Sequence, residues 1–290
     1  MKKLVTLLLA FVLSVSFSIN PMQAEKDDGD EKQQEQEDEK EKKKEDGKKD
    51  TEDKPKHEIP SHVLNISKEN TYPNTTKDQT VLEPNKLAKE LIESAEEEIS
   101  NPELIKMLNE STLKPSKLAI GYRGEIYLGY WPIHYKSNES NVNWEYQQIN
   151  TNVSNNLGGT EKAIIHYNQE EEQRIKGGLT SKTDRSSDVM KMIILNAQKN
   201  TDLPLSLEAV FGRGTKKPQS YGVPPKNVGY LHAYAPALNE KGVVTFGEVY
   251  LVLKGSKKIL EVRNVTKQGI GAWIPIQDHV SFSFQLKSTP

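Results

Sequence analysis

A run of 33 residues, 25–57, contains no apolar side chain, but 15 acidic residues and 10 lysines. Because nothing in this run can be buried to offset the entropy cost of ordering the backbone, we expect it to stay disordered. It therefore confines the folded part of the chain to residues 58–290. We interpret the run as a disordered charged spacer, although a merely solubilising leader explains the same composition.

Residues 1–24 have the pattern of a secretory signal peptide. Lys2 and Lys3 precede the apolar run Leu4–Ile19, and a short polar segment follows it. A positively charged start before a short apolar stretch is typical of such signals. The apolar run has 16 residues, fewer than the roughly 20 that a membrane-spanning helix requires. The sequence therefore predicts an exported protein.

We place the signal cleavage between Ala24 and Glu25, where the apolar segment has ended and the charged run begins. Met22, third from the predicted cut, is not a small residue, so an uncleaved membrane anchor is the alternative. Cleavage leaves a mature chain without an integral membrane span. An exported chain of this size without cysteine, beginning Met-Lys-Lys, indicates a secreted or extracytoplasmic protein of a bacterial cell envelope.

The body, residues 58–290, is close to electrically neutral, with 27 basic and 26 acidic residues. This balance argues against a protein that binds nucleic acid through bulk positive charge. The chain has no cysteine, which excludes disulfides, thiolate metal sites and a cysteine nucleophile. We expect one globular domain over this length.

Apolar periodicity predicts two helices at the start of the body. Leu87, Leu91, Ala95 and Ile99 lie on one helical stripe. Asn101, followed by proline, is expected to cap a second short helix that ends near residue 109. Residues 187–197 fit a helix capped by Ser187, but their β-branched side chains also fit a buried strand.

Alternating and β-branched segments dominate the remainder and predict strands. These are expected at 63–66, 118–122, 126–135, 142–153, 162–168, 203–211, 228–238, 243–254, 258–265 and 280–287. Turns or loops are expected at 123–124, 216–227, 239–242 and 255–256. The fold class is therefore α+β, a predominantly antiparallel β body with one or two N-terminal helices packed on it.

No catalytic, cofactor or metal motif stands out. The six histidines have no HxH or HExxH spacing, and no glycine-rich phosphate loop or G-x-S-x-G turn occurs. We therefore assign no catalytic residues, metal ligands or cofactors. Several carboxylates lie near aromatic residues, and a pair of them is what a glycosidase would need. These are Glu125, Glu139, Glu145, Glu248 and Asp278.

Aromatic residues concentrate between residues 122 and 146, where seven of them occur within 25 positions. Tyrosine and tryptophan combine an apolar ring with a polar group, so on an exposed sheet they bind sugars or peptides, and inside a protein they build cores. With a turn at 123–124, three of them, Tyr127, Trp131 and Tyr135, would share a face. The candidate binding residues are Tyr122, Arg123, Tyr127, Trp131, Tyr135 and Trp144.

The stretch Leu118–Pro132, LAIGYRGEIYLGYWP, follows a signal-peptide pattern and a polar leader. In this arrangement the chain resembles the YfkD-like family, exported proteins of Bacillus-type Gram-positive bacteria without an assigned function. The resemblance covers roughly residues 58–290, with the charged run as an addition. It implies an extracytoplasmic location and transfers no catalytic residues.

Three functions remain open from the sequence. The first is a non-catalytic envelope-associated domain that binds cell-wall glycan or an envelope protein, and neither nucleic acid nor a cofactor. The second is an envelope hydrolase that cleaves glycan or peptide with a carboxylate pair. The third is a structural or chaperone-like envelope protein whose strand edges meet partner chains.

Overall fold

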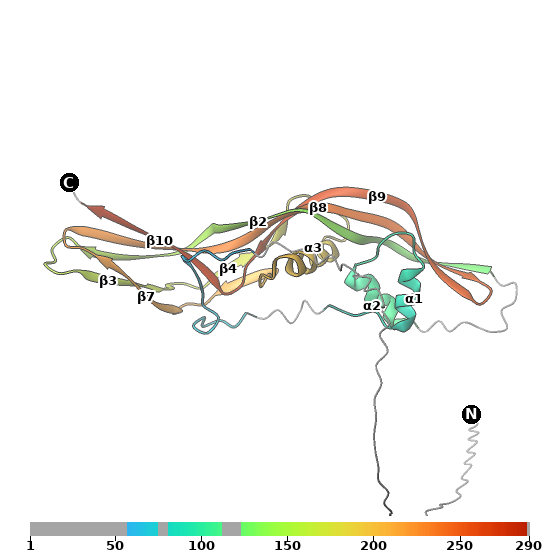
Figure 1. The fold of residues 1–290 in the computed structure, drawn as a ribbon, viewed down its shortest axis with the longest axis horizontal. Coiled ribbons are helices and arrows are strands. Elements are labelled where there is room, and N and C mark those ends of the chain that lie inside the picture. The colour runs from blue at the N-terminus through green and yellow to red at the C-terminus, as the bar shows by residue number, and fades with distance from the viewer. Residues whose placement is uncertain (1–56, 75–80, 112–122, 289–290) are drawn as a thin grey trace, which may run out of the picture. The chain divides into compact units, whose positions relative to one another are not determined.

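Three long antiparallel strands organise the fold: β2 (Arg123–Asn156), β8 (Asn227–Lys254) and β9 (Lys257–Pro275). The structure is a computed structural model that describes residues 57–74, 81–111 and 123–288. β8 is central, because β2 pairs with it along its whole length on one side (Figure 1). On its other side β8 pairs first with β10 (His279–Ser288) and then with β9.

Short strands complete the β structure. β1 (Val63–Asn65) pairs with β10, and β5 (Gly178–Leu179) pairs with β9, which makes a six-stranded sheet. Two separate two-stranded sheets are formed by β3 (Ala163–Asn168) with β7 (Lys216–Val223), and by β4 (Gln173–Lys176) with β6 (Glu208–Phe211). Every strand pair is antiparallel, so the expected α+β class with a predominantly antiparallel body is confirmed.

Three helices are present in the described residues: α1 (Lys86–Glu93), α2 (Pro102–Glu110) and α3 (Ser186–Thr201). The Oδ1 atom of Asn101 accepts hydrogen bonds from the backbone N–H groups of Glu103 and Leu104, at 2.8 and 3.2 Å. The predicted cap of α2 is thereby confirmed. The helical interpretation of the ambiguous segment after residue 186 is also confirmed.

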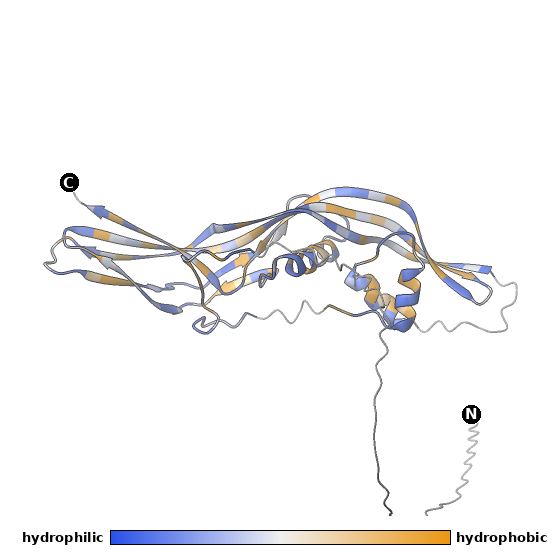
Figure 2. Cartoon of the chain, viewed as in Figure 1, coloured by the Kyte–Doolittle hydropathy of each residue, from blue (hydrophilic) through white to orange (hydrophobic). Residues whose placement is uncertain are grey.

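The hydrophobic core consists of three clusters, and Figure 1 shows the helices and small sheets on one side of the long strands. α1 and α2 pack on one end of β2, β8 and β9, with Leu104 and Leu251 among the buried residues. α3 packs on the middle, around Ile193 and Phe246. The two small sheets cover the remaining end, around Leu231. Hydrophobic and hydrophilic side chains accordingly alternate along the long strands (Figure 2).

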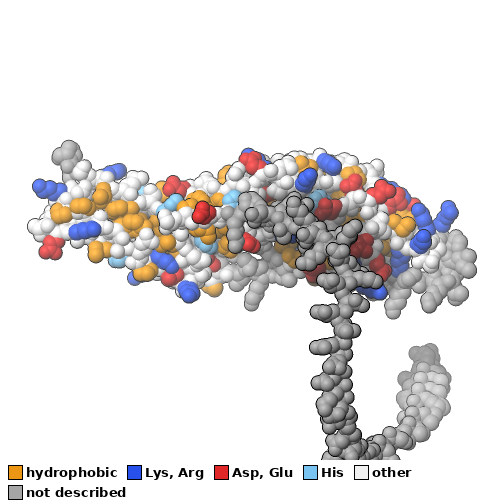
Figure 3. Space-filling view, in the orientation of Figure 1, with side chains coloured by type: hydrophobic (Ala, Val, Ile, Leu, Met, Phe, Trp, Pro, Cys, Tyr) orange, Lys and Arg blue, Asp and Glu red, His pale blue; other side chains and the backbone are white. Residues whose placement is uncertain are grey.

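The opposite face of the sheet is less buried. Along β8 the side chains of Leu231 and Ala233 are fully buried, whereas those of Tyr230, His232 and Tyr234 between and beside them reach solvent. Figure 3 shows hydrophobic side chains at the surface over the end that β3, β7 and β10 form.

Two predicted turns are strands in the structure. Arg123 and Gly124 pair with Lys254 and Leu253 at the start of β2, and the segment 239–242 continues β8 without a turn. The predicted loop 216–227 also contains a strand, β7, whose only partner among the described strands is β3. Proline and glycine are tolerated there because an edge strand leaves one side of its backbone unpaired. The turn at Gly255-Ser256 is confirmed.

Several predictions concern residues outside the described ranges. These are the signal peptide (1–24) with its cleavage between Ala24 and Glu25, the charged run up to residue 56, and the strand at 118–122. The described residues all fall within one compact unit. Among the described residues, no helix has the length and apolarity needed to cross a membrane.

Candidate functional site

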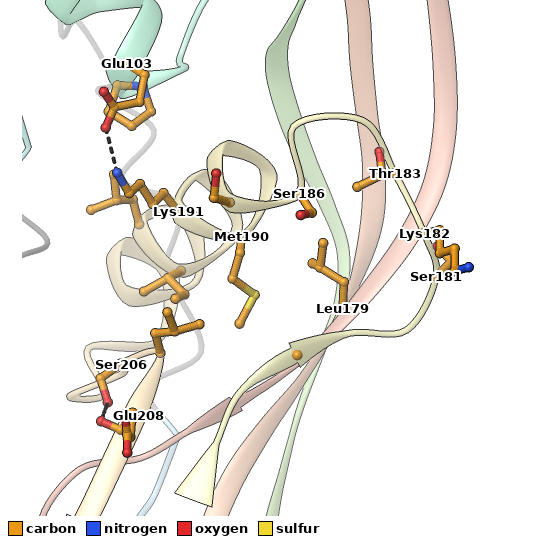
Figure 4. Close-up of a pocket in the computed structure, with 16 residues that line it drawn as sticks. Glu103, Leu179, Ser181, Lys182, Thr183, Ser186, Met190, Lys191, Ser206 and Glu208 are labelled. Atoms are coloured by element: carbon orange, nitrogen blue, oxygen red, sulfur yellow. Dashed lines mark hydrogen bonds and ion pairs between the residues drawn. The ribbon is translucent and has the colours of Figure 1, made fainter.

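An open pocket of about 860 Å³ lies beside α3 (Figure 4). Its walls are α3, the first residues of α2, the segment 178–183 and the segment 206–208. Five apolar side chains line it: Leu179, Met190, Ile194, Leu195 and Leu207. Five hydroxyl groups also line it: Ser181, Thr183, Ser186, Ser187 and Ser206. An apolar lining with a few polar groups, at this volume, is typical of small-molecule and cofactor sites.

The start of α3 is fixed by Arg185, not by Ser187 as the sequence suggested. Arg185 has a left-handed backbone (φ 47°) and is the N-cap residue, which makes no side-chain capping hydrogen bond. Its guanidinium lies 3.6 Å from the centre of the Trp131 ring and pairs with Asp188 at 3.3 Å. This cation–π contact holds the first turn of the helix against β2.

The wall opposite α3 is a short edge segment tied to β9. Leu179 of β5 pairs with Ala272, and the hydroxyl of Thr180 hydrogen-bonds with the backbone of Gly271. The hydroxyl of Thr183 lies 3.0 Å from Gln268 Oε1. The segment is therefore anchored at both ends. In Figure 4 the side chains of Met190, from α3, and Leu179, from β5, both extend into the space between the two walls, so these two side chains form its floor.

Three of the four charged side chains that line the pocket are paired, whereas Lys182 makes no ion pair within the described residues. Lys191 of α3 donates to Glu103 of α2 at 2.6 Å, which bridges the two helices over the pocket. That hydrogen bond is the largest cause of a pKa of Glu103 below its usual range. Glu208 pairs with Arg174 at 3.4 Å. Because a general acid must keep its proton near neutral pH, Glu103 does not suit that role.

A buried carboxylate lies elsewhere in the core under α3. Glu240 is fully buried, and its two oxygens accept hydrogen bonds from the hydroxyls of Tyr135 and Ser140. Burial, and then the neighbouring Glu240, raise the pKa of Tyr135 well above its ordinary value. Glu240 does not line the pocket, and its hydroxyl partners suit it to a structural role.

The structure separates the aromatic residues that the sequence grouped. Trp131 and Tyr135 are buried in two different core clusters, and Trp144 packs partly buried against the cluster under α3. Tyr127 is 55% exposed and lies on the opposite face, where its ring contacts that of Tyr250 at 5.1 Å. The prediction that Tyr127, Trp131 and Tyr135 share a face is therefore wrong.

An irregularity in β2 causes this separation. The register shifts between Tyr127 and Gly129, and Gly129 has a φ of 112°. A bulge inserts one extra residue, so the alternation of faces is inverted beyond it. Of the other candidates, Arg123 is exposed at the start of β2, and Tyr122 lies outside the described residues. Trp131, through Arg185, contacts a segment that leads into the pocket, and Tyr135 and Trp144 pack with the core cluster that contains the pocket residues Met190 and Ile194.

Sequence reasoning did not find the pocket. Its apolar residues come from three separate segments, so no single stretch of the sequence indicated them. Within residues 57–74, 81–111 and 123–288, no three histidine, aspartate or glutamate side chains gather as a metal site.

Comparison with known proteins gives a family and a relative. The family described as "YfkD-like protein" matches residues 60–290. A Bacillus subtilis (strain 168) protein described as "Uncharacterized protein YfkD" is 59% identical over 237 residues. The aligned part covers 82% of this chain and 90% of the relative.

Proposed function

The chain belongs to the YfkD-like family, and from this premise we propose that it is an exported, envelope-associated binding domain without catalytic activity. The signal-peptide pattern of residues 1–24 and the charged run that follows support the location. The partner is a component of the bacterial cell envelope, either wall glycan or an envelope protein. α1 and α2 form an N-terminal helical layer on the sheet, and α2 supplies one wall of the binding pocket.

The α3 pocket is the observation that carries this proposal. Its floor is apolar, and Leu207 at its edge is 57% exposed. Glu103, Lys191 and Glu208 are paired with other protein groups, which leaves Lys182 at the rim as the charged group without an ion pair in the described residues. The ligand group that fits is apolar, with hydrogen-bonding atoms at its edge that meet the serine and threonine hydroxyls.

A pair of leucine variants tests the proposal. Leu207→Glu places a charge at the pocket edge, whereas Leu157→Glu places the same charge at a leucine that is 38% exposed and does not line the pocket. Both are at the surface, so both variants should fold. The full chain is co-sedimented with isolated Gram-positive envelopes, and released sugar and peptide are measured in the supernatant.

We expect saturable binding without release of fragments. Leu207→Glu should weaken binding roughly 10- to 150-fold, because losing the burial of one leucine costs about 1.5–3 kcal/mol, and Leu157→Glu should bind as the parent does. Release of soluble fragments would contradict the absence of catalysis. Equal binding by both variants would show that the pocket is not the site that binds the envelope component.

A further inference from the structure

A second surface lies on the face of the sheet that the helices do not cover. Tyr230, His232 and Tyr234 project from β8 on this face, at alternating positions. The ring centres of Tyr230 and His232 are 6.3 Å apart with planes 9° from parallel, and those of His232 and Tyr234 are 6.5 Å apart. We call these three residues, with Thr151 and Lys287 beside them, the ladder face.

Both neighbouring strands add polar groups to the ladder face. Thr151 of β2 lies opposite His232, and its hydroxyl is 3.0 Å from His232 Nδ1. Gln285 of β10 lies opposite Tyr230 on the other side. The rings are thus flanked by side chains that can donate and accept hydrogen bonds, which is the combination that a sugar ring requires: an apolar surface below and polar partners at its edge.

The charge of this surface has one sign. The strand segments 147–156, 227–235 and 281–288 contain no aspartate or glutamate. Lys287 places its ammonium 4.9 Å from the centre of the Tyr230 ring, and it makes no ion pair with any carboxylate in the described part of the chain. A negative group on a ligand stacked over Tyr230 would therefore meet an available cation.

We propose that the ladder face binds an extended anionic polysaccharide. The rings of Tyr230, His232 and Tyr234 stack with successive sugar units, and Lys287 pairs with a carboxylate of the polysaccharide. A row of rings along one strand fits a linear polymer, since the strand rises about 3.3 Å per residue and so presents a ring every second residue. The proposal rests on the proposed function only for the location of the protein, because this surface is separate from the α3 pocket.

Isothermal titration of the full chain with amidase-treated peptidoglycan glycan strands tests the proposal. Removal of the peptides leaves a carboxylate on every second sugar, and chitohexaose serves as a neutral glycan. We expect binding of the carboxylated strands that weakens with added salt, because exposed charge pairs are screened, and weaker binding of chitohexaose. Poly(glycerol phosphate) distinguishes a sugar ligand from a polymer that offers negative charge alone.

Four variants form two matched pairs. Tyr230→Ala should weaken binding roughly tenfold, whereas Tyr127→Ala removes an exposed tyrosine elsewhere and should leave binding unchanged. Lys287→Glu should weaken binding and flatten its salt dependence, whereas Lys257→Glu changes the same charge at the exposed start of β9 without effect. Lys287 is exposed near the end of β10, so this variant tests the proposal even if Tyr230→Ala fails to fold.

Equal affinity for chitohexaose, preferential binding of poly(glycerol phosphate), or unchanged binding by folded Tyr230→Ala would each overturn the proposal. A larger loss in Tyr127→Ala would assign the glycan to the Tyr127–Tyr250 contact instead and would equally overturn it. Failure of this proposal is distinguishable from failure of the pocket. Leu207→Glu should bind the glycan strands normally, and Lys287→Glu should leave the pocket intact.

Discussion

Gly177 and Gly178, adjacent residues where the pocket wall begins, should respond oppositely to the same substitution. A Cβ atom on Gly177 would lie 2.9 Å from Met190 Cε, 2.9 Å from the backbone oxygen of Trp273 and 3.1 Å from Pro275 Cδ. Met190 can move, but the backbone of β9 cannot move without disturbing its pairing with β8. A Cβ atom on Gly178 has no atom within 4 Å.

Overpacking of this kind costs about 1–3 kcal/mol. For a unit of the length of residues 52–290, a loss of about 2 kcal/mol lowers the Tm by roughly 4–8 °C. Gly178→Ala should be neutral or should stabilise the fold by up to about 1 kcal/mol, because alanine restricts the unfolded chain. Gly177→Ala should also disturb the pocket floor, because Met190, which forms part of that floor, is the neighbouring side chain that can move most easily.

Thermal unfolding followed by circular dichroism, on both variants and the parent chain, measures the difference. Because the two variants add the same methyl group at neighbouring positions, changes in the unfolded state largely cancel between them. A Tm for Gly177→Ala within 1–2 °C of that for Gly178→Ala, well inside the expected shift, would refute the close approach of α3, β5 and β9 at this point.

Two further predictions concern alkaline pH and the start of α2. Burial raises the pKa values of Tyr135 and Tyr167 above their ordinary value, so the unfolded chain loses these protons near pH 10 while the folded chain keeps them. Stability should therefore be fully present below about pH 10 and decline above it, and denaturant titrations of the double variant Tyr135→Phe/Tyr167→Phe should show a smaller decline. Asn101 is fully buried, caps α2 and donates to the backbone oxygen of Pro132 at 2.6 Å, so Asn101→Ala should cost about 2 kcal/mol in the free energy of unfolding. Asn101→Asp, which keeps the capping oxygen but loses the donor, should also be destabilised, and equal stability of Asn101→Ala and the parent would contradict this role.

Local signals sufficed where a structural element depends on its own residues. Asn101 followed by proline indicated the start of α2, and the glycine at 255 indicated the β8–β9 turn, because capping and tight turns are decided within a few positions. Local signals failed where the pairing between strands determines the structure. The segment Asn239–Gly242 has the composition of a turn, but in β8 it is paired on both sides, with Ser137–Asn141 of β2 and Ile270–Trp273 of β9. Tertiary pairing of this kind overrides local propensity.

The same reasoning explains why the aromatic residues were grouped wrongly. Alternation assigns faces correctly only while the register is regular, and β2 shifts its register five times along 34 residues. Tyr127 and Trp131 lie on either side of the shift at Gly129, so counting by two places them together and the structure places them apart. Between Tyr230 and Tyr234 the pairing of β8 with β10 is regular, and the register shift opposite Tyr234 places its extra residue in β2, so β8 itself keeps its alternation. The density of aromatic residues was thus a weaker guide to a surface than the regularity of the strand that carries them, which is why the ladder face was the surface open to prediction from the sequence.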